Sequence, residues 1–146
     1  MADPTLRAWR LLLTVQAELV ETLAREMADE SGGLPLTWYE VLLLLYEAGG
    51  RMRMHELAES LLLSRSATTR FVDRMVEAGL LTREAATDDR RGVFVALTGE
   101  GGRTFGEAAP RHLAGIRRHF SAHVTDEEAA VMIEALERVL EAVRSP

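Results

Sequence analysis

The stretch SRSATTRFVDRMVEAGL, residues 64–80, decides how the rest of the sequence is interpreted. Its apolar residues recur at helical spacing, which predicts an amphipathic helix with one face packed against a domain. Ser64 precedes the helix with a short hydroxyl side chain of the kind that caps helix N-termini, and Gly79 follows its last turn. We expect the packed face to consist of Ala67, Phe71, Val72, Met75 and Ala78.

The opposite face of this helix has a composition that suits DNA. Its first three turns hold arginines and short hydroxyl residues, and Asp73 is the only acid among them. Hydroxyl residues are poor helix formers, but they let a helix approach base edges and phosphates closely, while arginine supplies long-reach contacts. A solvated helix face is the alternative. The residues expected to contact DNA are Arg65, Ser66, Thr69, Arg70 and Arg74.

The flanking segments predict a winged helix-turn-helix. A short helix is expected over residues 55–61, and a β-hairpin over residues 80–98, in which alternating Val93, Val95 and Leu97 indicate one buried strand face. The hairpin tip carries Arg90 and Arg91, and a narrow minor groove attracts arginine. A solvated turn would be satisfied equally well by the Asp, Arg and Gly residues of this tip.

One helix is expected between the N-terminal segment and the short helix at residues 55–61. Glycine and proline in residues 31–35 end the segment before it. Thr37 is predicted to cap the helix in a capping box with Glu40, and the helix should stop at Gly49 and Gly50.

Long helices with apolar stripes are predicted at both ends of the chain. The first spans residues 5–29, and the last begins after Thr125, where Glu128 completes a capping box. Thr98 should cap the helix before it, from about residue 99 towards 120. A domain of this size cannot cover these apolar stripes. The simplest explanation is that the stripes pack against each other and against the same stripes of a second chain, in an isologous homodimer. The expected fold is mainly α with a small β-hairpin wing.

Composition narrows the classes of function. The chain has 146 residues and a net charge of −6, and all 17 basic residues are arginines. Residues 51–103 hold nine of these arginines against eight acids and form the only segment that is not acidic. The absence of cysteine excludes disulfides, thiolate metal clusters and cysteine redox switches. The longest apolar run, Val41–Leu45, is far shorter than the roughly 20 residues that cross a bilayer, so we expect no membrane contact and a cytoplasmic location.

Several motifs of this lobe together point to one family. They include LAE at residues 57–59, LSRS at 63–66 and TRFVDRM at 69–75. The most specific are DRRG at residues 89–92 and VALTGEG at 95–101. With these motifs the chain resembles the MarR family of bacterial transcriptional regulators over almost its whole length. The resemblance implies a triangular homodimer whose recognition helices enter adjacent major grooves of a pseudo-palindromic operator, with wing arginines in the flanking minor grooves.

The resemblance also assigns roles to particular residues. It implies that the five exposed residues of the capped helix contact DNA, and that Arg90 enters a minor groove with Asp89 and Arg91 as its supports, although either arginine could be the one that enters. It implies a single domain over residues 1–146, with dimerisation helices at 5–30 and 104–146 around a DNA-binding lobe at 37–103. Two departures stand out: leucines fill the turn at residues 61–63 where relatives often have glycine, and Arg53 replaces a frequent Ser or Thr cap.

Relatives often bind small aromatic or anionic molecules between the dimer helices and the lobes. The resemblance makes Trp9, Arg10 and Trp38 the candidates for such an effector site. The alternative places Trp9 in the dimer seam and Trp38 in the core.

Three histidines give a weaker signal. His112, His119 and His123 share one face of an unbroken helix, and the last two alone have metal-ligand spacing. No carboxylate is placed to join them, so structural or solvated histidines are expected, with a metal site or a pH-dependent interface as alternatives.

The sequence therefore predicts a regulator and not an enzyme. We expect a homodimer that binds double-stranded DNA sequence-specifically as a ligand-responsive repressor, without a cofactor. The alternative is a winged-helix module that binds a protein instead of DNA.

Overall fold

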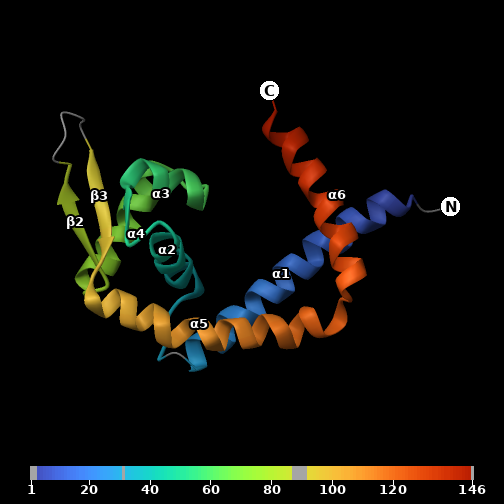
Figure 1. Cartoon of the computed structure of the whole chain (residues 1–146), viewed down its shortest axis with the longest axis horizontal. Coiled ribbons are helices and arrows are strands. Elements are labelled where there is room, and N and C mark those ends of the chain that lie inside the picture. The colour runs from blue at the N-terminus through green and yellow to red at the C-terminus, as the bar shows by residue number, and fades with distance from the viewer. Residues whose placement is uncertain (1–2, 31, 87–91, 146) are drawn as a thin grey trace. The chain divides into compact units, whose positions relative to one another are not determined.

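The structure is a computed structural model that describes residues 3–30, 32–86 and 92–145. The chain divides into two compact units, residues 1–112 and 113–146, and each is described here by itself. The elements of the first unit in chain order are α1 (Pro4–Glu30), α2 (Leu36–Glu47), β1 (Arg51–Arg53), α3 (Met54–Leu61), α4 (Arg65–Glu77), β2 (Leu81–Ala85), β3 (Val93–Leu97) and the first part of α5 (Gly99–His119) (Figure 1).

The second unit contains the end of α5, the short 3₁₀ helix η1 (Ser121–His123) and α6 (Asp126–Arg144). The described residues thus form six α-helices and a small antiparallel sheet. The predicted fold, mainly helical with a small β wing, is confirmed.

The first unit has a core to which each of its helices contributes. Leu42 and Leu45 of α2 and Leu57 of α3 are fully buried, and Val72 and Met75 of α4 join them. Met27 is the residue through which α1 enters this core. From α5, the ring of Phe105 stacks on that of Tyr39 with 5.5 Å between the centroids.

The sheet has the strand order β1-β3-β2, and both pairings are antiparallel. Strand β1 was not predicted, because three residues are too few to give a periodic signal. Only Val95 of the three alternating residues in β3 is fully buried, and Val93 at the start of the strand is exposed. The guanidinium groups of Arg51 and Arg53 lie 4.0 and 4.6 Å from the ring centroid of Phe94. These arginines thus cover the aromatic ring on one face of the sheet.

Three of the four predicted side-chain helix caps are present. Ser64, Thr98 and Thr125 each accept a hydrogen bond from a backbone N–H three residues later. The predicted cap at Thr37 is wrong: α2 begins two residues earlier than predicted, with Pro35 as its N-cap, and no side chain caps it. Proline has a fixed φ and already sits in extended backbone here, so the helix starts directly after it.

The turn between α3 and α4 contains a leucine in left-handed backbone, at a position where relatives often have glycine. Leu62 has φ 56° and ψ 35°, and it is the only non-glycine with positive φ among the described residues. Its side chain is 89% exposed, so packing does not compensate for the conformation.

Long apolar stripes stay uncovered in both units. Only Met27 of α1 is buried, and no residue of α6 is. No described helix is long and apolar enough to cross a membrane. Exposed large apolar residues are Leu6, Trp9, Leu11, Leu12, Leu13, Val15 and Val20 on α1, and Val131, Met132, Ile133, Leu136, Val139, Leu140 and Val143 on α6.

Candidate nucleic-acid interface

Helix α4 is fixed to the first unit by its inner face and by its N-terminal cap. The Ser64 hydroxyl accepts a hydrogen bond from the Ala67 N–H at 3.1 Å, which satisfies one of the free donors of the first turn. Val72 and Met75 are fully buried as expected, and Ala67 and Phe71 are partly buried. Ala78, predicted for this face, is the exposed C-cap residue, because the helix ends before it can turn inward.

The packed face of α4 includes Thr68, which was not predicted to lie there. It is completely buried, and its hydroxyl donates to the Ser64 carbonyl at 2.9 Å. That bond satisfies the polar group in the core, so this threonine stabilises the helix and is not available to a ligand.

The five predicted DNA-contacting residues all lie exposed on α4. They are Arg65, Ser66, Thr69, Arg70 and Arg74. Within the described part of the chain, the guanidinium groups of the three arginines have no ion-pair partner. Their charges are therefore available to phosphates or guanine bases.

The single acid in the first three turns of α4 is paired with an arginine of a neighbouring strand. Asp73 forms an ion pair with Arg83 of β2, and the same guanidinium donates to the Thr69 carbonyl at 3.5 Å. Arg83 was missed by sequence reasoning, although a signal was present. Period-two alternation from the buried Leu81 places Arg83 on the side of β2 that faces the helices.

The wing strands pair in full register from Leu81 with Leu97 to Ala85 with Val93. The Ala86 N–H donates to the Gly92 carbonyl at 3.3 Å, and Arg51 of β1 forms an ion pair with Glu84 of β2 at 3.6 Å. The expected minor-groove residues Asp89, Arg90 and Arg91 lie outside the described residues.

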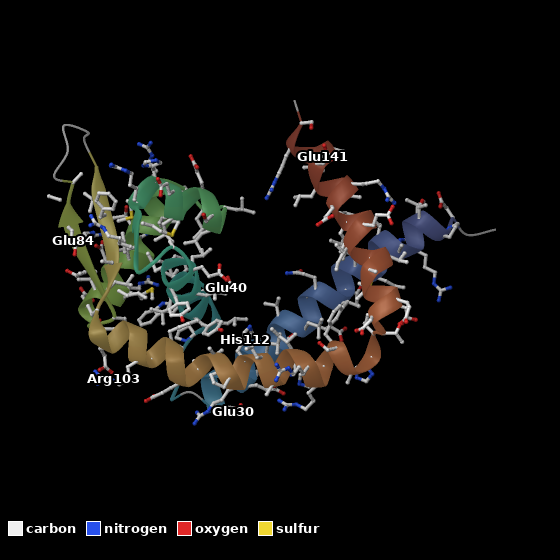
Figure 2. The ribbon with its side chains drawn as sticks, in the orientation of Figure 1. Glu30, Glu40, Glu84, Arg103, His112 and Glu141 are labelled. Carbon is white, nitrogen blue, oxygen red and sulfur yellow. The ribbon has the colours of Figure 1, made fainter. Side chains whose placement is uncertain are left out.

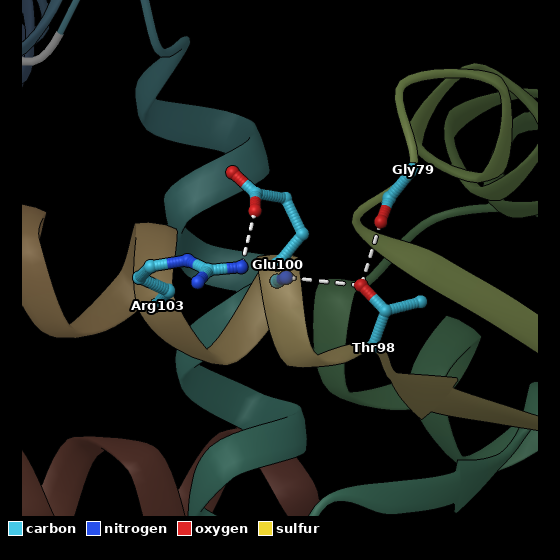
Figure 3. A network of polar contacts seen from close by, with 5 residues as sticks. Gly79, Thr98, Glu100 and Arg103 are labelled. Atoms are coloured by element: carbon cyan, nitrogen blue, oxygen red, sulfur yellow. Dashed lines mark hydrogen bonds and ion pairs between the residues drawn. The ribbon is translucent and has the colours of Figure 1, made fainter.

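One threonine connects the end of α4 to the start of α5 (Figure 3). The Thr98 hydroxyl donates to the Gly79 carbonyl at 2.6 Å and accepts from the Gly101 N–H at 3.0 Å. A Cβ at Gly101 would lie 2.1 Å from the Leu80 carbonyl oxygen, so only glycine permits this close approach. Arg103 and Glu100 form an ion pair at the surface beside this junction.

The candidate effector residues have different environments. Trp9 and Arg10 lie exposed on α1, and Trp38 packs partly against the core. None of these three residues lines the cavity enclosed by α2, α3 and α4.

No group of three or more His, Asp and Glu side chains in the described ranges could hold a metal ion. The ring of His112 lies 4.7 Å from that of Tyr39, and its buried Nδ1 has no hydrogen-bond partner among the residues that the structure describes. Burial lowers the pKa of His112, which favours the uncharged ring.

Comparison with known proteins agrees with this geometry. Residues 32–92 match a family model described as MarR family. Over 107 residues, the chain is 33% identical to the HTH-type transcriptional regulator MhqR of Bacillus subtilis (strain 168), an alignment that covers 73% of this chain and 72% of MhqR. The chain belongs to the MarR family of transcriptional regulators. It is thus related to DNA-binding proteins and not to enzymes.

Two solved MarR-family structures from Streptomyces coelicolor extend the similarity to the whole chain. AbsC is 36% identical with a TM-score of 0.90, over 99% of this chain and 97% of AbsC. Sco3205, solved in complex with DNA, is 28% identical with a TM-score of 0.89, over 99% of this chain and 91% of Sco3205.

Proposed function

We propose that this MarR-family protein is a homodimeric repressor that binds a pseudo-palindromic operator sequence-specifically and releases it when a small molecule binds. The observation that carries this proposal is the outer face of the first three turns of α4. There three arginines without an ion-pair partner among the described residues flank exposed Ser66 and Thr69, and the only acid of these turns, Asp73, is paired with Arg83. Sco3205, a relative of the same fold, was solved with DNA.

The proposed dimer uses the apolar stripes of α1 and α6, as the sequence suggested for residues 5–30 and 104–146. Burying these stripes in a second copy would remove a large apolar surface from water. Two copies related by a twofold axis would present two α4 helices to half-sites about one helical turn apart. Such a dimer covers promoter DNA, and this coverage supports repression. In this proposal, Arg90 or Arg91 of each wing enters the flanking minor groove, and Asp89 supports it.

A binding titration tests the proposal. A fluorescently labelled fragment of the DNA upstream of the protein's own gene is compared with a scrambled fragment at several salt concentrations. We expect tighter binding to the promoter fragment, with log affinity falling by about 0.9 per neutralised phosphate for each unit of log salt. Equal binding to both fragments would contradict sequence specificity, and no binding would favour a protein-interaction module.

Arg70→Ala separates base recognition from phosphate binding. We expect a loss of about 1–3 kcal/mol on the promoter fragment and a smaller loss on the scrambled one. Arg103→Ala is the matched control, because this exposed arginine lies on α5 and is paired with Glu100. Equal losses on both fragments would make Arg70 a phosphate contact.

A further inference from the structure

A cavity of about 130 Å³ lies within the first unit, directly against the helix-turn-helix. It is bounded by the first turns of α2, the end of α3, the turn after it and the second turn of α4. Its lining is mostly apolar and contains one charged group. The lining residues are Thr37, Glu40, Val41, Leu61, Leu63 and Phe71.

The charged group is the carboxylate of Glu40, labelled on α2 in Figure 2. The predicted capping box would have tied this side chain to the backbone of Thr37, but Pro35 caps the helix instead. No hydrogen bond or ion pair joins Glu40 to any other residue of the described ranges. Glu40 is an exposed residue at the rim of the cavity, and partial burial of its carboxyl raises its pKa.

The size and lining of the cavity limit what it can hold. An apolar cavity of about 150 Å³ in another protein accommodates benzene. The present cavity is slightly smaller, but its exposed rim residues Thr37, Glu40 and Leu63 leave it open to solvent, so one aromatic ring can enter it and extend partly outside. Ligand sites commonly combine an apolar lining with a single polar group that fixes orientation. A carboxylate in that position attracts a cation and repels an anion.

We propose that this cavity binds a small organic monocation with one aromatic ring, whose ammonium group pairs with Glu40 while its ring packs against Leu61, Leu63 and Phe71. This site is separate from Trp9, Arg10 and Trp38, and it selects a charge opposite to that of an anionic effector.

The position of the cavity gives its occupant a route to the DNA-binding face. Leu63 directly precedes the α4 cap residue Ser64, and Phe71 directly follows Arg70. A bound ring would contact both the turn and the underside of α4, so it would favour a different position of this helix. This regulatory part rests on the proposed function, whereas the binding site itself does not.

Binding is tested on the full-length protein without DNA. Benzylamine is the probe, and benzyl alcohol and benzoate are its neutral and anionic counterparts of similar size. Titrations followed by NMR of leucine methyl groups should show saturable benzylamine shifts at Leu61 and Leu63. We expect benzyl alcohol to bind at least tenfold more weakly and benzoate not to bind. Benzyl alcohol binding as tightly as benzylamine, or no benzylamine shifts, would overturn the site.

Two variants localise the site, and a third is the control. Glu40→Gln keeps the shape of the side chain and should weaken benzylamine binding at least tenfold. Leu63→Trp fills the cavity from its exposed rim and should abolish the shifts, with circular dichroism showing that the fold is retained. Glu47→Gln removes an acid from the same helix outside the cavity and should change nothing. Equal affinity in Glu40→Gln and the unmodified protein would refute the proposed ion pair.

A second titration tests the regulatory part. The affinity for the promoter fragment is measured with and without saturating benzylamine, and we expect at least a threefold change that Glu40→Gln removes. Unchanged affinity in a protein that binds both DNA and benzylamine would overturn the effector role. A protein that binds benzylamine but no DNA would overturn the proposed function and leave the cavity assignment standing.

Discussion

Three hydroxyl residues near the start of α4 have different roles in the candidate interface. Thr68 is buried and bonded to the Ser64 carbonyl, so it belongs to the packing of the helix. Ser66 lies 3.2 Å from the Ser64 hydroxyl, next to the cap. Thr69 is exposed, and its carbonyl accepts a hydrogen bond from Arg83. All three residues carry a hydroxyl group, but their positions around the helix give them different roles.

The pair of Asp73 and Arg83 gives a prediction at this scale. Arg83→Gln would leave an unpaired carboxylate on the face proposed to approach phosphates, so we expect the affinity for the promoter fragment to fall about threefold or more at low salt. Asp73→Asn in the same chain should restore most of the loss, because it removes the repelling charge. Anisotropy titrations of both variants measure the effect. A double variant as weak as the single one would mean that Arg83 itself touches DNA.

His112 gives a prediction of acid sensitivity. Burial lowers the folded-state pKa of this histidine below its ordinary value near 6.5, so the unfolded chain binds the proton at higher pH than the folded chain does. The contribution of His112 to stability is therefore lost as pH falls from about 6.5 through the folded-state pKa. His112→Phe keeps a ring against Tyr39 and should lose less stability between pH 7.5 and 5.5.

Urea unfolding midpoints at the two pH values measure this difference. His55→Gln is the matched control, because His55 is an exposed histidine elsewhere in the same unit. If the unmodified protein and His112→Phe lost stability equally on acidification, another group would be responsible.

At the scale of elements, two adjacent glycines of α5 have opposite expected effects. Gly101→Ala would place a Cβ against the Leu80 carbonyl and should destabilise the protein by about 1–3 kcal/mol. Gly102→Ala meets nothing within 4 Å and should stabilise it by about 0.5–1 kcal/mol, because alanine is the better helix former. Urea unfolding measures both. Similar effects of the two variants would contradict the close contact between α5 and the start of β2.

Most element boundaries followed from local signals in the sequence. Ser64, Thr98 and Thr125 are N-cap residues as predicted, because a short hydroxyl before an apolar period acts within one turn of chain. The predicted cap at Thr37 was wrong, because α2 already begins after Pro35, which is its N-cap residue. Strand β1 was missed because its three residues become a strand only by pairing with β3, and that pairing depends on contacts distant in sequence.

At the scale of the whole molecule, the sequence predicted the residues of the proposed interface better than the residues that pack beside or beneath it. The exposed arginines of α4 follow from helical periodicity alone. The pairing of Arg83 with Asp73 and the cavity beside Glu40 depend on how strands and helices pack, which no single segment specifies. The apolar faces of α1 and α6 were predicted correctly.

Leu136→Glu places a charge in the apolar stripe of α6 and should prevent the proposed dimer from forming. Sedimentation equilibrium should then give the mass of one chain, where the unmodified protein gives twice that mass. The thermal midpoint of the unmodified protein should rise with protein concentration. Arg138→Glu is the control, since it changes charge on the polar side of the same helix, where Arg138 pairs with Glu134. A variant that remains dimeric would show that α6 does not form the contact.

The separation of packing from contact on α4 has a consequence for how such a regulator diverges. Thr68, Val72 and Met75 hold the helix in place, whereas none of the five outward residues contributes to the core. Substitutions at these outward positions therefore carry little folding penalty. After gene duplication, each copy is free to acquire a new target site by a few surface changes while it retains its ancestral architecture.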